Sequence, residues 1–199
     1  MKLDKTAVKE LEKAIKQKAK AYGYKGINGW IFAKIGDCFA DSVSVVVNRT
    51  KLTHRIKIKK LSYDDLFWDI MNMSDNKLQP LSLRANGAFK APGITISEDE
   101  IELDENVEDI ADTYCSVVAS TVKSFLDNNS VGEYVLTKVS SPYAPVLRCL
   151  EYLDRGDTAS ALEIANSEIS MGNCGGFSNE GKNFFEWVVH YCSYKQSLI

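Results

Sequence analysis

The side chain best suited to nucleophilic chemistry is Cys174, which lies in a glycine-rich segment over residues 172–176. We expect a helix to begin soon after it, and the positive end of a helix dipole favours a thiolate. A cysteine nucleophile also needs a base, and the chain has two histidines, His54 and His190. His190 falls about 18 Å from the start of that helix, because a helix rises about 1.5 Å per residue. His54 lies in a region of predicted strands and would meet Cys174 only through the tertiary fold. We therefore predict a loop cysteine without a catalytic role.

Metal-binding and cofactor-binding patterns are absent from the sequence. The five cysteines are scattered, with no Cys-x-x-Cys pair, and no second His or Cys pair stands at zinc-site spacing. On a helix, His190 and Cys192 would point to different sides. The acidic run over residues 98–104 lacks the ligand order of an EF-hand, because Ile101 occupies its third position. No phosphate-binding glycine loop or nucleophile elbow occurs. We expect neither a metal nor a cofactor, and the sequence favours a binding protein over an enzyme.

Charge is divided unevenly along the chain. Residues 1–60 hold 15 Lys or Arg and 5 Asp or Glu, a net charge of +10. Residues 61–199 hold 9 and 22, a net charge of −13. Two interpretations stay open. The two parts pack together and neutralise each other, which we favour, or they present separate faces to a partner.

Two charged runs supply the candidate binding residues. The acidic run precedes and enters a predicted helix, and we expect it to attract a protein partner. The basic run alternates with apolar residues, as in a strand with one wet face. With the lysines of the first helix it would suit nucleic acid, although a lysine-protected outer face of a sheet is favoured. The candidates are Glu98, Asp99, Glu102, Asp104, Glu105, Glu108, Asp109, Arg55, Lys57 and Lys59.

The elements that position these residues follow from hydrophobic periodicity. Residues 2–22 predict an amphipathic helix, residues 30–35 and 41–48 a hairpin, and residues 55–59 a strand. Residues 82–86 and 93–96 are two weaker strand candidates. Beyond the acidic run, a long helix is predicted to end near residues 127–129, and Ser178 is a candidate cap for the final helix. The fold class is therefore α+β, with an N-terminal helix, an antiparallel sheet of about 4–5 strands and a C-terminal bundle of about 4–5 helices.

Two resemblances add to this. Residues 150–162 resemble the middle of a tetratricopeptide repeat, but the pattern occurs once and indicates an isolated helical hairpin. The order of a helix, Gly23-Tyr24-Lys25, Trp30-Ile31-Phe32 and an antiparallel sheet resembles small uncharacterised bacterial α+β domains, some of which are immunity partners of toxins. That resemblance covers roughly the first 100 residues and implies a protein-binding role.

We expect residues 1–199 to form a single domain, with a subdivision into residues 1–98 and 99–199. The first residues lead into a charged helix rather than a secretory signal, and no apolar stretch is long enough to span a membrane. We therefore expect a cytoplasmic protein that binds another protein. Binding of nucleic acid is the second candidate function, and an enzyme with a dispersed site is the third.

Overall fold

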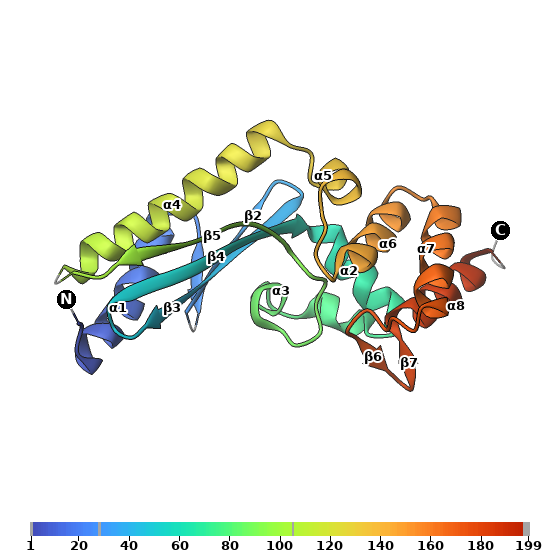
Figure 1. The fold of residues 1–199 in the computed structure, drawn as a ribbon, viewed down its shortest axis with the longest axis horizontal. Helices are drawn as coiled ribbons and strands as arrows, with labels where there is room; N and C mark the ends of the chain where they lie inside the picture. The colour runs from blue at the N-terminus through green and yellow to red at the C-terminus, as the bar shows by residue number, and fades with distance from the viewer. Residues whose placement is uncertain (1, 28, 105, 197–199) are drawn as a thin grey trace. The chain divides into compact units, whose positions relative to one another are not determined.

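The structure is a computed structural model that describes residues 2–27, 29–104 and 106–196. It confirms the predicted α+β class, with an N-terminal helix, a five-stranded antiparallel sheet and several further helices (Figure 1). The chain divides into two compact units, and each unit draws on two separate stretches. Unit 1 comprises Met1–Lys59 and Gly93–Asn129, and unit 2 comprises Lys60–Pro92 and Ser130–Ile199. Residue 98 lies inside a strand of unit 1 rather than at a boundary between units.

Unit 1 begins with the predicted amphipathic helix. The Asp4 carboxylate accepts hydrogen bonds from the backbone N–H groups of Thr6 and Ala7 and so caps the helix. Gly23 ends it in the left-handed conformation, with φ of 81°, which glycine adopts without steric cost. The helical elements of unit 1 are α1 (Lys5–Lys18), the short 3-10 helix η1 (Ala19–Tyr22) and α4 (Val107–Asn128).

The sheet of unit 1 has the order β1-β2-β3-β4-β5, so strands that follow one another in the chain also lie side by side. The predicted hairpin is confirmed, with Ile31 opposite Ser42 and Ala33 opposite Ala40. The fifth strand returns from a distant part of the chain and pairs antiparallel with β4. The strands are β1 (Lys25–Ile27), β2 (Trp30–Ile35), β3 (Cys38–Val47), β4 (Lys51–Lys60) and β5 (Ile94–Glu102).

The acidic run was expected to lead directly into a helix, and its first part is instead a strand. Residues 98–102 belong to β5, where Glu98 stands opposite Arg55 and Glu102 stands opposite Lys51. Cross-strand pairs of opposite charge favour this register. The strand predicted near residues 93–96 is therefore present, but it continues to Glu102.

Helices α1 and α4 cover one face of the sheet, which we call the helix face. On β3, the Ser42 hydroxyl lies 2.8 Å from the Tyr114 hydroxyl of α4. On β4, the His54 ring lies edge-on to the Tyr114 ring at 5.5 Å between centroids. Because side chains alternate along a strand, the even-numbered residues of β3 and β4 point to the helix face. The odd-numbered residues point to the opposite face, which we call the open face.

Unit 2 is helical apart from one small hairpin, and its core is aromatic. The centroid of the Phe67 ring lies 4.8 Å from that of the Phe177 ring and 5.8 Å from that of the Phe184 ring. The predicted isolated hairpin over residues 150–162 is confirmed by the adjacent helices α6 and α7. The elements are α2 (Leu61–Ile70), η2 (Ser74–Leu78), α3 (Leu83–Asn86), α5 (Val131–Thr137), α6 (Ala144–Asp154), α7 (Thr158–Ser170), β6 (Ser178–Asn179), β7 (Lys182–Asn183) and α8 (Phe184–Gln196).

Two local predictions in unit 2 are wrong. Residues 82–86 form the short helix α3 rather than a strand, closed by a hydrogen bond from the Gly87 N–H to the Leu83 carbonyl. Ser178 begins the β6–β7 hairpin and does not cap the final helix. Asn183 takes that role, because its side chain accepts from the backbone N–H groups of Phe185 and Glu186. In both places a short polar stretch fits more than one local structure.

None of the helices in the described part of the chain combines the length and the apolar character needed to cross a membrane.

The buried histidine of unit 1 makes the stability of the fold sensitive to acid. His54 is 3% exposed, and neither of its ring nitrogens has a hydrogen-bond partner among the described residues. Burial lowers the pKa of His54, against the opposing charge of Asp99 on β5. The unfolded chain therefore takes up a proton near pH 6.5 that the folded chain does not. The free energy of unfolding should fall as pH drops below that value, by up to about 1.4 kcal/mol per pH unit.

Urea denaturation at pH 7.5, 6.5 and 5.5 tests this for the wild type and for His54→Leu. We expect the decrease in the free energy of unfolding between pH 6.5 and 5.5 to be smaller in the variant than in the wild type. Equal losses in the two proteins would show that His54 does not cause the acid sensitivity.

Candidate functional site

The fold brings the basic N-terminal stretch and the acidic run into the same unit, so charge is divided more evenly between the two units than along the sequence. Unit 1 holds 15 Lys or Arg and 15 Asp or Glu, a net charge of zero. Unit 2 holds 9 and 12, a net charge of −3. The acidic run joins the basic N-terminal stretch in the same unit, because β5 and α4 pack with β4 and α1. Within unit 1, the basic N-terminal stretch and the acidic run therefore balance in net charge.

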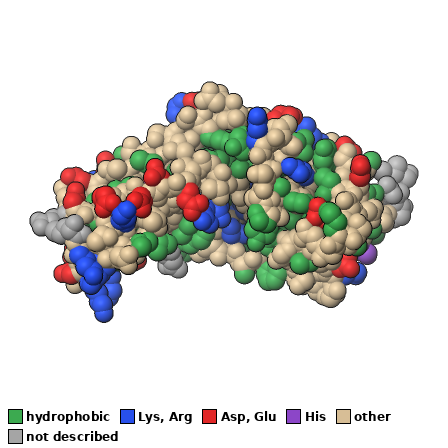
Figure 2. Space-filling view, in the orientation of Figure 1, with side chains coloured by type: hydrophobic (Ala, Val, Ile, Leu, Met, Phe, Trp, Pro, Cys, Tyr) green, Lys and Arg blue, Asp and Glu red, His purple; other side chains and the backbone are tan. Residues whose placement is uncertain are grey.

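The neutralisation has a definite geometry on β4 and β5. The Arg55 guanidinium lies 2.6 Å from the Glu98 carboxylate, and the Lys51 ammonium pairs with Glu100 and Glu102. We call these five residues the ion-pair ladder. Figure 2 shows acidic and basic side chains side by side over this part of the molecule. All five side chains are more than a third exposed, so each pair contributes at most about 1 kcal/mol.

The basic candidates do not share one solvent-exposed face as predicted. Arg55 is exposed and Lys57 is half-buried, but Lys59 is fully buried. The Lys59 ammonium lies 5.6 Å from the centroid of the Phe39 ring, at the end of the open face where Phe39 and Asp41 are also buried. A strict alternation of lysines predicts the face of a strand but not which end of that face is covered.

The acidic candidates fall into three groups. Glu98 and Glu102 belong to the ion-pair ladder, and Glu108 lies 3.7 Å from Lys18 of α1. Three others bind groups of their own segment: Asp99 accepts from the Glu100 N–H, Asp104 from the Asn106 N–H and Asp109 from the Asn106 side chain. Glu105 lies outside the described residues. The acidic run is thus partly compensated rather than a continuous negative face.

The open face of the sheet carries an exposed apolar strip that sequence reasoning did not single out as a site. Val45 is 55% exposed and Val47 is 37% exposed, whereas Trp30 and Val43, a directly paired couple, are half-buried. We call these four residues the valine strip. The Thr53 hydroxyl donates to the Val45 carbonyl, so β4 runs beside this strip. The alternation of Val43, Val45 and Val47 with polar neighbours was the available signal, but it could not tell an exposed face from a covered one.

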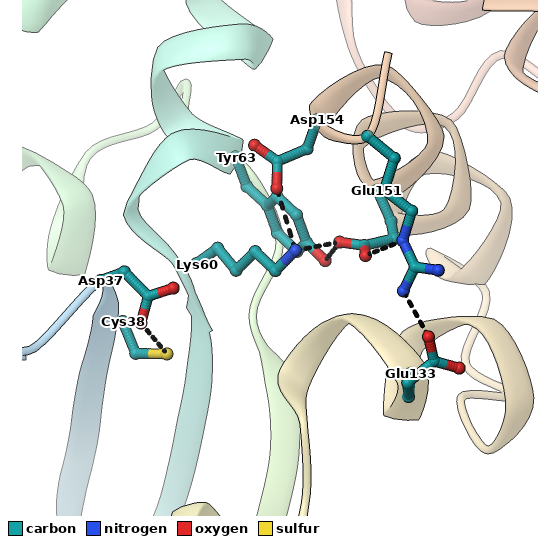
Figure 3. A network of polar contacts seen from close by, with 8 residues as sticks. Asp37, Cys38, Lys60, Tyr63, Glu133, Glu151 and Asp154 are labelled. Atoms are coloured by element: carbon teal, nitrogen blue, oxygen red, sulfur yellow. Dashed lines mark hydrogen bonds and ion pairs between the residues drawn. The ribbon is translucent and has the colours of Figure 1, made fainter. Parts of the chain in front are cut away.

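The strongest cluster of titratable groups lies in unit 2 and surrounds Glu151, which is fully buried. Its carboxylate accepts from the Tyr63 hydroxyl at 2.6 Å, from the Lys60 ammonium at 2.7 Å and from Arg155 Nε at 2.6 Å (Figure 3). Arg155 also pairs with Glu133 of α5, and Lys60 with Asp154. A side-chain carbon at Gly132 would overlap the Glu151 carboxylate, so glycine is required there for α5 to approach α6.

This cluster is closed to chemistry, because each oxygen of the carboxylate already has a partner. Burial alone would raise the pKa of Glu151, but the hydrogen bonds from Lys60, Tyr63 and Arg155 outweigh it and lower the pKa. Burial and the same carboxylate raise the pKa of Tyr63. A general acid or base needs a pKa near the working pH and access to substrate. The arrangement instead holds α2, α5 and α6 together.

Of the groups considered for catalysis, Cys174 and His190 lie in different elements of unit 2. Cys174 is exposed in the loop after α7, and the β6–β7 hairpin separates it from the start of α8. His190 is exposed on α8, with its ring against Trp187 at 5.4 Å between centroids. His54 belongs to unit 1. Across the described residues, no three His, Cys, Asp or Glu side chains gather into a group that could hold a metal ion.

Comparison with known proteins gives no relative, because the chain matches no family model, no curated protein and no solved structure.

Removal of the Glu151 carboxylate should be strongly destabilising. Glu151→Ala leaves the buried Tyr63 hydroxyl without its acceptor and opens a cavity, whereas Lys60 and Arg155 keep Asp154 and Glu133 as partners. We expect a cost of about 2–4 kcal/mol. Asp154→Ala is the matched control, since Asp154 pairs with the same lysine but is partly exposed and should cost about 1 kcal/mol or less. Chemical denaturation at pH 7 measures the free energy of unfolding of both variants and of the wild type. Similar losses in the two variants would contradict a structural role centred on Glu151.

One thiol should react in the native protein. Cys38, Cys115, Cys149 and Cys192 are buried and Cys174 is exposed. Burial raises the pKa of Cys115 to about 12 and also raises that of Cys149, so these thiols stay protonated and shielded. Labelling with a chromogenic disulfide should modify one thiol rapidly, and the rest after denaturation. Cys174→Ser should abolish the rapid phase, and a rapid phase that survives would place a second reactive thiol at the surface.

Proposed function

We propose that the chain is a binding protein whose ligand is another protein, and that the valine strip with the adjoining ion-pair ladder forms the contact surface. The observation that carries this is the exposure of Val45 and Val47 at the C-terminal end of β3. Protein interfaces characteristically combine an apolar centre with a polar rim. The strip supplies the centre, and Lys51, Arg55 and their glutamates supply the rim.

An immunity-like role, in which the chain covers a toxin, is the form of this function that the order of elements in the first 100 residues favours. A covering protein acts by occupying a surface and needs no catalytic group of its own. The ladder would supply paired charges that can exchange partners when the toxin binds. Electrostatic complementarity of this kind acts mainly on the association rate and on specificity.

The test compares two double variants that add the same charge. Val45→Glu with Val47→Glu places two carboxylates in the proposed contact surface. Leu78→Glu with Met171→Glu changes two side chains of unit 2 that are 88% and 66% exposed. Proteins captured from an extract of the source organism, and the product of the neighbouring gene, would be purified and titrated by calorimetry against the wild type and both variants.

We expect the valine-strip variant to bind at least about tenfold more weakly, equivalent to about 1.4 kcal/mol, and the control to bind as the wild type does. Thermal melts of both variants establish that each is folded. Equal affinity in all three proteins would rule out this surface.

A further inference from the structure

A groove runs between α1 and the sheet on the helix face of unit 1. It consists of two adjoining cavities of about 280 and 550 Å³. Both are lined by Glu12 and Ile15 of α1 and by Gly29 and Ser44 of the sheet, so they form one continuous depression. A volume of several hundred Å³ is in the range of ligand-binding sites. Trp30 and Val45 of the valine strip also line the groove, whereas Val43 and Val47 do not. The two surfaces therefore adjoin.

The floor of the groove is apolar. Leu11 and Ile15 of α1 reach into it from one side, and Ile31 and Leu52 of the sheet from the other. All four are buried, with at most 4% exposure. Val8 and Val46 are half-buried at its sides. The four floor side chains are already shielded from water. A ligand would gain stability by covering Val8, Val46 and the exposed Val45, which also line the groove.

One rim of the groove is basic. Lys9, Lys13 and Lys16 line it from α1 and are exposed. Their spacing of i, i+4 and i+7 places them along one strip of the helix, about 10 Å long at the helical rise. No ion pair joins any of the three to an acid within the described residues. Glu12, which also lines the groove, stands four residues before Lys16 and offsets part of the repulsion among the lysines. The rim keeps a net positive charge that an anionic ligand would neutralise.

We propose that the groove binds an acidic amphipathic helix of the protein partner. Such a helix would place apolar side chains on the floor and carboxylates at i, i+4 and i+7 against the three lysines. The inference rests on the proposed function, since it takes the occupant to be part of the protein ligand. Binding of an amphipathic helix through its apolar face in a groove is a recurrent mode of peptide recognition.

The arrangement of charge favours this occupant over two others. A fatty acid has a single carboxylate, whereas the lysines are spread along two turns of α1 rather than gathered at one point. A nucleic acid would satisfy all three lysines through phosphates, but its charged backbone would bury no apolar surface on the floor.

The test uses a fluorescein-labelled synthetic helix of about 14 residues with leucines on one face and glutamates beside it at i, i+4 and i+7. A second peptide with lysine in place of glutamate is the ligand control. The protein variants are Lys9→Glu/Lys13→Glu/Lys16→Glu in the rim and Lys20→Glu/Lys25→Glu/Lys34→Glu elsewhere on unit 1. Both triple variants change the net charge equally, and all six lysines are exposed, so both should fold. Binding is followed by fluorescence anisotropy at low and at physiological salt.

We expect the acidic peptide to bind the wild type and to lose at least about tenfold in affinity with the rim variant, against about twofold or less with the control variant. The lysine peptide should not bind. The inference is overturned if the acidic peptide fails to bind at low salt, if the lysine peptide binds equally well, or if both variants lose the same affinity. Tight binding of oleate or of a short DNA duplex without binding of the peptide also overturns it.

The two proposals fail separately in the calorimetric assay with the purified partner when Val47→Glu alone serves as the valine-strip variant, because Val47 does not line the groove. If the rim variant binds the partner as the wild type does while the valine-strip variant does not, the groove inference is wrong and the contact surface stands. If the rim variant loses affinity while the valine-strip variant keeps it, the groove inference stands and the contact surface on the open face is wrong.

Discussion

The pairing of β5 with β4 is the constraint on which unit 1 depends. It brings a segment that follows β4 by more than thirty residues back to the sheet and places α4 on the helix face beside α1. The ladder of Arg55, Lys51 and their glutamates contributes little free energy, because its members are exposed. Its effect is on register: a shift of one residue would turn Ile56 and Leu52 out of the core and separate the paired charges. The charges also protect an edge strand from pairing with other chains.

Most of the fold could be predicted because it follows from local patterns. The helical period of α1, the alternation in β4 and the caps at Asp4 and Gly23 each act over a few residues. The division into units could not be predicted, because it depends on where β5 pairs. The acidic run looked like the start of a helix because glutamate is a better helix former than strand former. Tertiary pairing with Arg55 and Lys51 outweighed that preference.

For the candidate sites too, the local features could be predicted from the sequence and the tertiary contacts could not. Sequence reasoning identified the charged side chains of β4 and β5 and favoured their mutual neutralisation, but it could not say which of them pair, because the pairs follow from the register of the two strands. It missed Glu151, since a single glutamate inside a helix has no signal that distinguishes it from a solvated one. What sets Glu151 apart is Lys60 and Tyr63, nearly ninety residues earlier, and the missing side chain of Gly132. Burial of the Glu151 carboxylate is tolerated because both of its oxygens have partners.

Once internal pairs are accounted for, the surplus positive charge of unit 1 is concentrated at its N-terminal helix. Residues 1–25 hold eight Lys and three Asp or Glu, and only Lys18 of α1 reaches the acids of α4. Lys16 lies in the last turn of α1, where a cation is favourable, and Glu12 stands four residues before it, so part of this charge stabilises the helix itself. Three of these lysines border a depression whose floor is apolar. Beside Glu12, Lys9, Lys13 and Lys16 leave the rim of this depression with a net positive charge, and that sign of charge is why the proposed ligand is acidic.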